Sequence, residues 1–309
     1  MTGTALRAAV LWVTGLGVVH RLVTRSSLGR RVAHRFVAGE RLEDGIAAAR
    51  SLDRRGIAAM LDHLGENVTS VAQASAAADG YALALKRIRE AESLDCNIAI
   101  KLTQLGLDLS MDLCIENTER VLAAAEPAGI LVMVDMESSE YVDRTLEVLR
   151  RLRDRHEGVG VAIQSALRRS AEDVFALPEG APIRLVKGAY LEPPAVAYPS
   201  RAEVDRAFAR LFATLVSLGH PVHVATHDPR LLEGACRLAD RRGLPSGRIE
   251  LQMLLGIRED LQRSYAERGY PVRAYVPYGA EWYPYLTRRL AERPANVWFF
   301  VSNVMRRRG

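Results

Sequence analysis

The segment I-R-L-V-K-G-A-Y, residues 183–190, contains the unit from which the fold can be inferred. Its first four residues form a short run of branched apolar side chains around Arg184, which is typical of a buried strand. Lys187, Gly188 and Tyr190 follow, and this change predicts that the strand ends in a loop. An arginine is costly to bury without an anionic or carbonyl partner. We therefore expect Arg184 to face a ligand or an ion-pair partner.

Similar runs recur from residue 56 onward and alternate with longer amphipathic stretches. The eight predicted strands cover residues 57–61, 98–102, 130–135, 159–164, 183–187, 222–226, 249–254 and 272–276. Examples of the predicted helices between them are residues 72–91, 112–125, 139–153, 202–218, 229–241 and 258–268. Eight strand–helix units predict a (β/α)8 barrel. A doubly wound sheet is the alternative, but the first run continues as L-D-H-L-G-E, without the G-x-G-x-x-G dinucleotide fingerprint.

Residues 1–55 precede the first strand, and residues 56–309 form the predicted barrel domain. We expect a helix over residues 42–54 and a second, apolar one over residues 8–19, both packing around the barrel. About a dozen apolar residues are too few to span a bilayer, for which roughly 18 to 20 are needed. Arginines flank the apolar segment, so contact with a membrane surface stays open as an alternative to packing.

The composition of the chain limits the classes of protein to which it can belong. The chain has 309 residues, 49% of them hydrophobic, which is enough to bury a large core. Three separate cysteines without a C-x-x-C pair argue against a disulfide framework and favour a reducing cytoplasm. A net charge of +5 favours anionic partners such as a phosphate-bearing cofactor or an acidic membrane. Dispersed basic residues without interleaved aromatic residues argue against nucleic acid.

Polar residues end the first six predicted strands and lie within the last two. In strand order they are Asp62, Lys101, Asp135, Gln164, Lys187, Thr226 to Asp228, Gln252 and Tyr275. A (β/α)8 barrel carries its active site at the carboxyl ends of its strands. Any one of these residues could be an ordinary loop residue, but eight together indicate a site.

The segment Y-V-P-Y-G-A-E-W-Y-P-Y-L-T-R-R-L-A-E-R-P-A-N, residues 275–296, adds arginines and tyrosines after the last strand. Adjacent helical arginines are commonly only a solvated face. Here Tyr285 precedes Arg288 by three positions and Glu292 follows both Arg288 and Arg289 within one helical turn, so both guanidinium groups could converge on one carboxylate. His223 and His227 could share a strand face, but the H-x-H and acidic ligands of a barrel metallohydrolase are missing. We therefore expect no metal.

These residues resemble the proline dehydrogenase family, specifically its single-function bacterial flavoenzymes. The resemblance rests on residues 184–190, 226–228, 252–254 and 275–296, and extends over the chain from the R-F-V-A-G-E segment at residues 35–40. It implies a distorted (β/α)8 barrel that binds FAD, with the last helix over the barrel mouth. It also implies oxidation of L-proline to Δ1-pyrroline-5-carboxylate, with electrons passed to a membrane quinone.

The resemblance assigns roles position by position. Asp135 and Arg184 are the implied catalytic residues. The residues implied to bind substrate are Lys101, Arg288, Arg289, Tyr275, Tyr285 and Leu254. Those implied to bind FAD are Met136, Gln164, Arg184, Lys187, Gly188, Ala189, Thr226 and His227. A metal-dependent barrel hydrolase and a non-catalytic binding barrel are the alternatives. The expected location is the cytoplasm, with peripheral contact to the inner face of the cell membrane left open.

Overall fold

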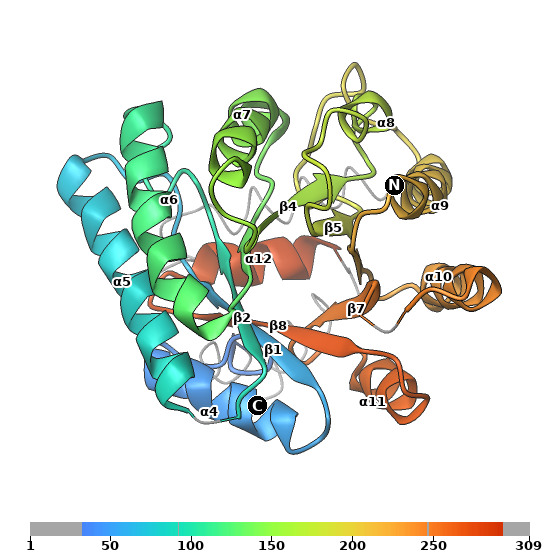
Figure 1. Cartoon of the computed structure of the whole chain (residues 1–309), viewed down its shortest axis with the longest axis horizontal. Coiled ribbons are helices and arrows are strands. Elements are labelled where there is room, and N and C mark those ends of the chain that lie inside the picture. The colour runs from blue at the N-terminus through green and yellow to red at the C-terminus, as the bar shows by residue number, and fades with distance from the viewer. Residues whose placement is uncertain (1–32, 92, 246, 293–309) are drawn as a thin grey trace, which may run out of the picture.

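The computed structural model describes residues 33–91, 93–245 and 247–292. Eight parallel strands pair in chain order, and the eighth also pairs with the first, so the sheet closes into a barrel (Figure 1). The strands are β1 (Ala58–His63), β2 (Cys96–Ile100), β3 (Val132–Val134), β4 (Val159–Gln164), β5 (Ile183–Val186), β6 (Val222–Ala225), β7 (Ile249–Leu254) and β8 (Val272–Tyr278). The predicted (β/α)8 barrel is confirmed. The predicted bounds of β4 and β7 are also confirmed, while β3 is shorter than predicted.

Helices surround the barrel, and α12 crosses the middle of the ring in Figure 1. The helices are α4 (Leu42–Asp53), α5 (Val71–Glu90), α6 (Met111–Ala125), α7 (Val142–Arg153), α8 (Ser170–Asp173), α9 (Arg201–Ser217), α10 (Pro229–Arg242), α11 (Glu259–Glu267) and α12 (Trp282–Glu292). The 3-10 helices η1 (Glu126–Ala128) and η2 (Ser139–Tyr141) precede β3 and α7. Among the α-helices of the described residues, α8 alone was not predicted, and the 3-10 helix η1 was not predicted either. α8 is a single turn, and Pro178 and Gly180 follow it closely, so this segment leaves little room for a full helix.

Side chains that start four of the helices explain why those helices begin where they do. Ser70, Ser110 and Ser200 each accept a hydrogen bond from a backbone N–H in the first turn of α5, α6 and α9. Asp228 does the same for α10, with Pro229 at the first helical position. Such caps satisfy backbone donors that have no partner inside the helix. The turn from β6 into α10 is therefore set by the motif Thr226 to Asp228.

The barrel interior contains a small apolar layer separate from the main core. It consists of Met60, Ala99 and Met133, with Tyr275 packed against it. Gly160 fits beside this layer because a Cβ there would lie 2.4 Å from the Pro182 carbonyl oxygen and 3.0 Å from Met133. Side chains alternate along a strand, so Asp62 points the same way as Met60. The apolar layer thus lies beneath a polar one at the carboxyl ends of the strands.

The segment before α4 connects the start of the described chain to the last strand and helix. Ala38 N–H donates to the Pro277 carbonyl, and Gly279 N–H donates to the Gly39 carbonyl. An apolar cluster joins this segment to α12, and its members are Ala33, Phe36, Val37, Leu64, Trp282, Tyr283, Tyr285 and Leu286. The predicted helix at residues 42–54 corresponds to α4. The apolar segment at residues 8–19 lies outside the described residues, and the division into two domains stays a prediction.

Candidate active site at the barrel mouth

Lys101 is the central cation of the polar layer. It follows β2 directly, and its ammonium nitrogen lies 2.7 Å from Asp62 Oδ1 and 3.5 Å from Asp135 Oδ2. Burial is the largest single influence and lowers the Lys101 pKa, but the attraction of Asp62, Tyr275 and Tyr81 together with the hydrogen bond to Asp62 holds that pKa well above its ordinary value. Lys101 is therefore a charged ammonium group at neutral pH.

Arg184 extends into the barrel from β5, as its place inside the apolar run predicted. It forms an ion pair with Asp135, and its guanidinium carbon lies 5.1 Å from the centre of the Tyr275 ring. One of its terminal nitrogens lies 3.2 Å from the Met60 sulfur. Burial lowers the Arg184 pKa, with Tyr275 and Asp62 opposing the shift, but an arginine stays charged under all ordinary conditions. The sequence left open whether Arg184 faces a ligand or an ion-pair partner, and the structure contains the ion pair with Asp135.

Asp135 receives contacts from three sides of the barrel. Besides Arg184 and Lys101, the Tyr275 hydroxyl donates to Asp135 Oδ2 at 2.7 Å. Burial raises the pKa of Tyr275, so this hydroxyl keeps its proton and acts as a donor. Residues from β2, β3, β5 and β8, far apart in the sequence, therefore meet at one carboxylate.

α12 and the end of β7 contribute the other predicted substrate residues. Tyr285 is buried, and the guanidinium carbon of Arg289 lies 5.3 Å from the centre of its ring. The Arg288 side chain lies outside the described residues. Leu254 ends β7, and its N–H donates to His227 Nε2 at 2.9 Å. The structure thus places Arg289, Tyr285 and Leu254 on elements that enter or leave the barrel mouth.

A cavity of about 550 Å³ opens beside Lys101. Its walls come from the loop between β1 and α5, the start of α5, and the residues around the start of α12. They include His63, Glu66, Gln104, Glu281 and Pro284. This volume is in the range of small-molecule sites. The cavity connects the charged layer of the barrel to the underside of α12.

The opposite part of the mouth contains most of the predicted cofactor residues. Gln164 ends β4, and its side-chain amide donates to the carbonyls of Met136 and Glu137 at 3.2 and 2.7 Å. Gly188 has φ +116°, and a Cβ there would lie 2.9 Å from Gln164 Oε1. Glycine is required at this position because the backbone conformation is left-handed and the space is filled. Gly188 and Gln164 therefore form one close-packed wall.

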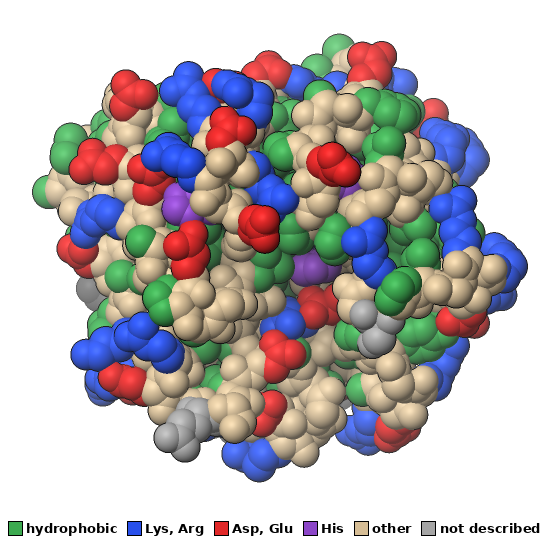
Figure 2. All heavy atoms as spheres, viewed as in Figure 1, with side chains coloured by type: hydrophobic (Ala, Val, Ile, Leu, Met, Phe, Trp, Pro, Cys, Tyr) green, Lys and Arg blue, Asp and Glu red, His purple; other side chains and the backbone are tan. Residues whose placement is uncertain are grey.

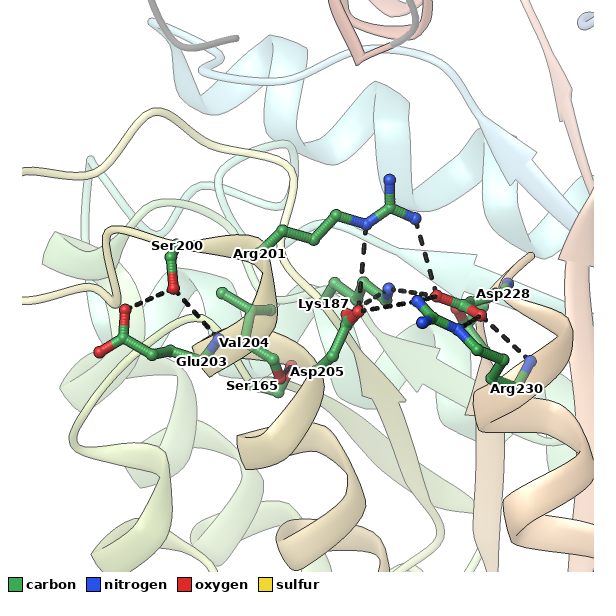
Figure 3. A network of polar contacts seen from close by, with 10 residues as sticks. Ser165, Lys187, Ser200, Arg201, Glu203, Val204, Asp205, Asp228 and Arg230 are labelled. Atoms are coloured by element: carbon green, nitrogen blue, oxygen red, sulfur yellow. Dashed lines mark hydrogen bonds and ion pairs between the residues drawn. The ribbon is translucent and has the colours of Figure 1, made fainter. Parts of the chain in front are cut away.

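Lys187 anchors a charged network beside that wall, on the outer side of the β5 and β6 ends (Figure 3). Its ammonium nitrogen lies 2.5 Å from Asp205 and 3.4 Å from Asp228. Arg201 and Arg230 contact the same two carboxylates, and both side chains are largely exposed. Three cations and two carboxylates leave an excess of one positive charge. β5 ends at Val186, one residue earlier than predicted, so Lys187 lies just past the strand end.

Thr226 and His227 follow β6, as predicted. Thr226 Oγ1 accepts a hydrogen bond from Asp228 N–H at 3.2 Å. His227 uses Nε2 to accept from Leu254, which assigns its proton to Nδ1. Ala189 lies in the loop after β5. On the face shown in Figure 2, acidic and basic side chains are interspersed, so neither sign of charge dominates that face.

The histidines in and around β6, which are His220, His223 and His227, make contacts other than metal coordination. His223 Nδ1 contacts the Gln252 amide at 2.9 Å, and His220 contacts the Ala181 carbonyl at 3.0 Å. Within residues 33–91, 93–245 and 247–292, no group of His, Cys, Asp or Glu side chains could hold a metal ion.

A rim of buried hydrogen bonds was not predicted from the sequence. Thr103 donates its hydroxyl to Glu137 Oε2 at 2.6 Å and its N–H to Oε1 at 3.1 Å, while accepting from Asn67 N–H at 3.1 Å. Gln164 adds the next connection through the Glu137 carbonyl. Burial raises the pKa of Glu137, and the bonds from Thr103 oppose the shift. The only sequence signal was that Glu137 follows the polar end of β3.

A closed barrel with charged side chains gathered at the carboxyl ends of its strands defines the class: a (β/α)8-barrel protein with its site at the mouth. The profile of the family described as Proline dehydrogenase matches residues 46–301. Over 306 residues the chain is 40% identical to Proline dehydrogenase of Deinococcus radiodurans, covering 97% of this chain and 98% of that one. Proline dehydrogenase 1 of Bacillus subtilis (strain 168) is 37% identical over 276 residues, 89% of this chain and 91% of that one. The chain therefore belongs to the proline dehydrogenase family.

Solved structures show the same barrel. Proline utilization A (PutA) from Bdellovibrio bacteriovorus, inactivated by N-propargylglycine, superposes with a TM-score of 0.79 at 25% identity. The match covers 85% of this chain and 32% of that one, so the chain spans about a third of the length of that protein. A PutA mutant from Bradyrhizobium japonicum gives a TM-score of 0.70 at 22% identity, covering 85% and 31%, which supports the fold alone. Among the described residues no helix has the length and apolar character needed to cross a membrane.

Proposed function

We propose that this protein oxidises L-proline to Δ1-pyrroline-5-carboxylate, with FAD as the cofactor and a membrane quinone as the final electron acceptor. The observation that carries the proposal is the buried layer of Lys101, Arg184, Asp135 and Tyr275 at the mouth of a barrel of this family. Proline carries a carboxylate and an amine on a small apolar ring. The layer offers cations for the first and aromatic surface for the ring.

The substrate's carboxylate is assigned to Lys101, Arg288 and Arg289. Lys101 borders the cavity below α12, and Arg289 lies against Tyr285 on that helix. A charged hydrogen bond in a site closed to water is stronger than one in solvent. Tyr275, Tyr285 and Leu254 would enclose the ring and exclude water from it.

The residues present fit FAD. Gly188, packed against Gln164, is only partly buried and carries no side chain, so a ligand could approach its backbone closely. Arg184 Nε is buried and has no hydrogen-bond partner among the described residues. Lys187, Thr226 and His227 would hold the phosphate-bearing part, and Met136 and Ala189 would contact the ring. When bound, FAD supplies the acceptor for the two electrons and hydrogen removed from the ring carbon next to nitrogen.

The chain's own residues would assist this step by charge and orientation. Arg184 presents a fixed positive charge, which stabilises negative charge that develops beside it. Asp135 holds Arg184 and, through the Tyr275 hydroxyl, fixes the ring of Tyr275 across the barrel. Proline must react as the neutral amine, so its ammonium proton must leave before the carbon–hydrogen bond breaks. No covalent nucleophile is required.

One spectrum tests the proposal. The purified protein should be yellow, with flavin absorption at about 450 nm that L-proline bleaches in the absence of oxygen. A water-soluble quinone should then restore the flavin absorption. In a separate experiment, the protein should sediment together with vesicles of bacterial lipids if it contacts the membrane. A colourless protein that takes up no added FAD would refute the proposal, as would flavin that proline leaves oxidised.

A further inference from the structure

Lysine is rare in this chain, which contains 42 lysines and arginines but only three lysines. Lys86 is exposed on α5, while Lys101 and Lys187 lie at the barrel mouth. An arginine keeps its charge without help, but a lysine readily loses its proton when buried. A lysine that must bind a carboxylate from a buried position therefore needs a neighbour that keeps it charged.

The groups that face Lys101 come from four elements. Asp62 comes from β1, Asp135 follows β3, Tyr275 comes from β8 and Tyr81 comes from α5. Asp135 is already bound by Arg184 and by the Tyr275 hydroxyl, and its distance to the Lys101 nitrogen is the longer one, 3.5 Å. The two tyrosines are uncharged at neutral pH. Asp62 is thus the carboxylate available to Lys101.

The geometry of Asp62 supports a dedicated role. The side chain is 1% exposed, Oδ1 accepts from Lys101 at 2.7 Å, and Oδ2 has no hydrogen-bond partner among the described residues. A carboxylate this deeply buried is costly unless it is paired, and Lys101 is the only ion-pair partner within 4 Å in the part of the chain that the structure describes. Lys101 therefore supplies the ion-pair partner that a carboxylate at this depth requires, and Asp62 is the nearer of the two carboxylates beside Lys101.

We infer that Asp62 is a positioning residue for substrate: its carboxylate keeps the Lys101 ammonium group charged and in place to bind the substrate's carboxylate. The substrate part of this inference rests on the proposed function, whereas the effect on the Lys101 charge does not. In this role Asp62 acts through Lys101 and itself contacts neither the substrate nor the cofactor.

The lysine content permits a direct measurement of that charge. Protein labelled with carbon-13 at the lysine Cε gives three signals, which Lys86→Arg and Lys187→Arg assign by removing one signal each. In the natural protein the Lys101 signal should keep the chemical shift of an ammonium group even above about pH 10.4, which is the ordinary lysine pKa. In Asp62→Asn its midpoint should fall by about one pH unit or more, because the nearest carboxylate no longer offsets the effect of burial.

Steady-state kinetics supply the second readout. In Asp62→Asn the KM for proline should rise about tenfold or more at pH 8, and further as the pH is raised, with a smaller change in kcat. Asp79→Asn is the matched control, since Asp79 forms an exposed ion pair with Arg120 on the outside of the barrel. It should change neither the Lys101 signal nor the KM.

The inference is overturned if Lys101 in Asp62→Asn titrates as in the natural protein, or if the KM is unchanged. If Asp62→Asn does not fold, Asp62→Glu tests the inference instead, because it keeps the negative charge but displaces it by one methylene group. A raised KM at unchanged kcat then supports the positioning role, and an unchanged KM overturns it. A natural protein that leaves proline unoxidised refutes the proposed function instead, while the lysine titration still reports on Asp62.

Discussion

The hydroxyl of Tyr275 on β8 donates to Asp135 at the end of β3, 140 residues earlier in the chain, at 2.7 Å. This bond spans the barrel mouth, because β3 and β8 are not neighbours in the closed sheet. The same carboxylate holds Arg184, so the proposed substrate-binding residue Tyr275 and the proposed cofactor-binding residue Arg184 share one partner. Changes at Tyr275 should therefore affect both.

Tyr275→Phe should lower kcat/KM for proline by about tenfold to a hundredfold. A hydrogen bond to a charged group contributes about 1.5–3 kcal/mol, and the buried carboxylate loses one of its donors. Steady-state kinetics with purified protein measure this.

The natural protein should also prefer proline over hydroxyproline because the Tyr275 ring and hydroxyl crowd the substrate ring. Comparable turnover of the two substrates would contradict that preference.

Arg289→Lys should raise the KM for proline with a smaller effect on kcat. The fork of the guanidinium group and its contact with the Tyr285 ring are both lost, at a cost of about 2–4 kcal/mol for a desolvated ionic contact. Arg150→Lys, in an exposed ion pair with Glu147, is the matched control and should behave like the natural protein. An unchanged KM in Arg289→Lys would remove Arg289 from carboxylate binding.

Gly188→Ala should release the flavin. The new methyl group would lie 2.9 Å from Gln164 Oε1 at φ +116°, so either the glycine backbone or the Gln164 side chain must move. The ratio of flavin absorbance at about 450 nm to protein absorbance after gel filtration reports retention. Gly234→Ala in α10, where a Cβ meets nothing within 4 Å, is the control and should raise stability slightly. Equal retention in both variants would show that Gly188 does not contact the cofactor.

His223 should make the protein sensitive to acid. Burial lowers its pKa from 6.5 to about 4, with Glu250 opposing the shift and Arg273 and Arg184 adding to it. Below pH 6.5 the unfolded chain therefore binds a proton that the folded protein does not bind until about pH 4. The free energy of unfolding should fall through this window by up to about 1.4 kcal/mol per pH unit from this residue.

Urea unfolding at several pH values between 7 and 4.5 measures the effect. His223→Gln should reduce the slope without abolishing it, because burial also lowers the pKa values of His63 and His220. An identical slope in His223→Gln would show that His223 does not carry this sensitivity.

Local sequence determined which segments are strands and helices. Short apolar runs ended by polar residues located the eight strands, and the serine and aspartate caps set where four helices begin. The polar strand ends also selected Lys101, Asp135, Gln164 and Tyr275 for the mouth, because parallel strands place their carboxyl ends at one side. The family resemblance added the roles of these residues, and the match to the family supports the resemblance. The sequence pattern did not predict α8, because a single helical turn has no periodicity to detect.

Tertiary structure alone decided which charges meet. Periodicity within a segment describes the direction of a side chain relative to its neighbours, and it carries no information on distances across a barrel. Closure of β8 onto β1, and the register between adjacent strands, bring Lys101 to Asp62 and Arg184 to Asp135. The rim from Asn67 through Thr103 to Glu137 arises in the same way. These contacts join residues that are distant in sequence, so they exist only once the sheet has closed.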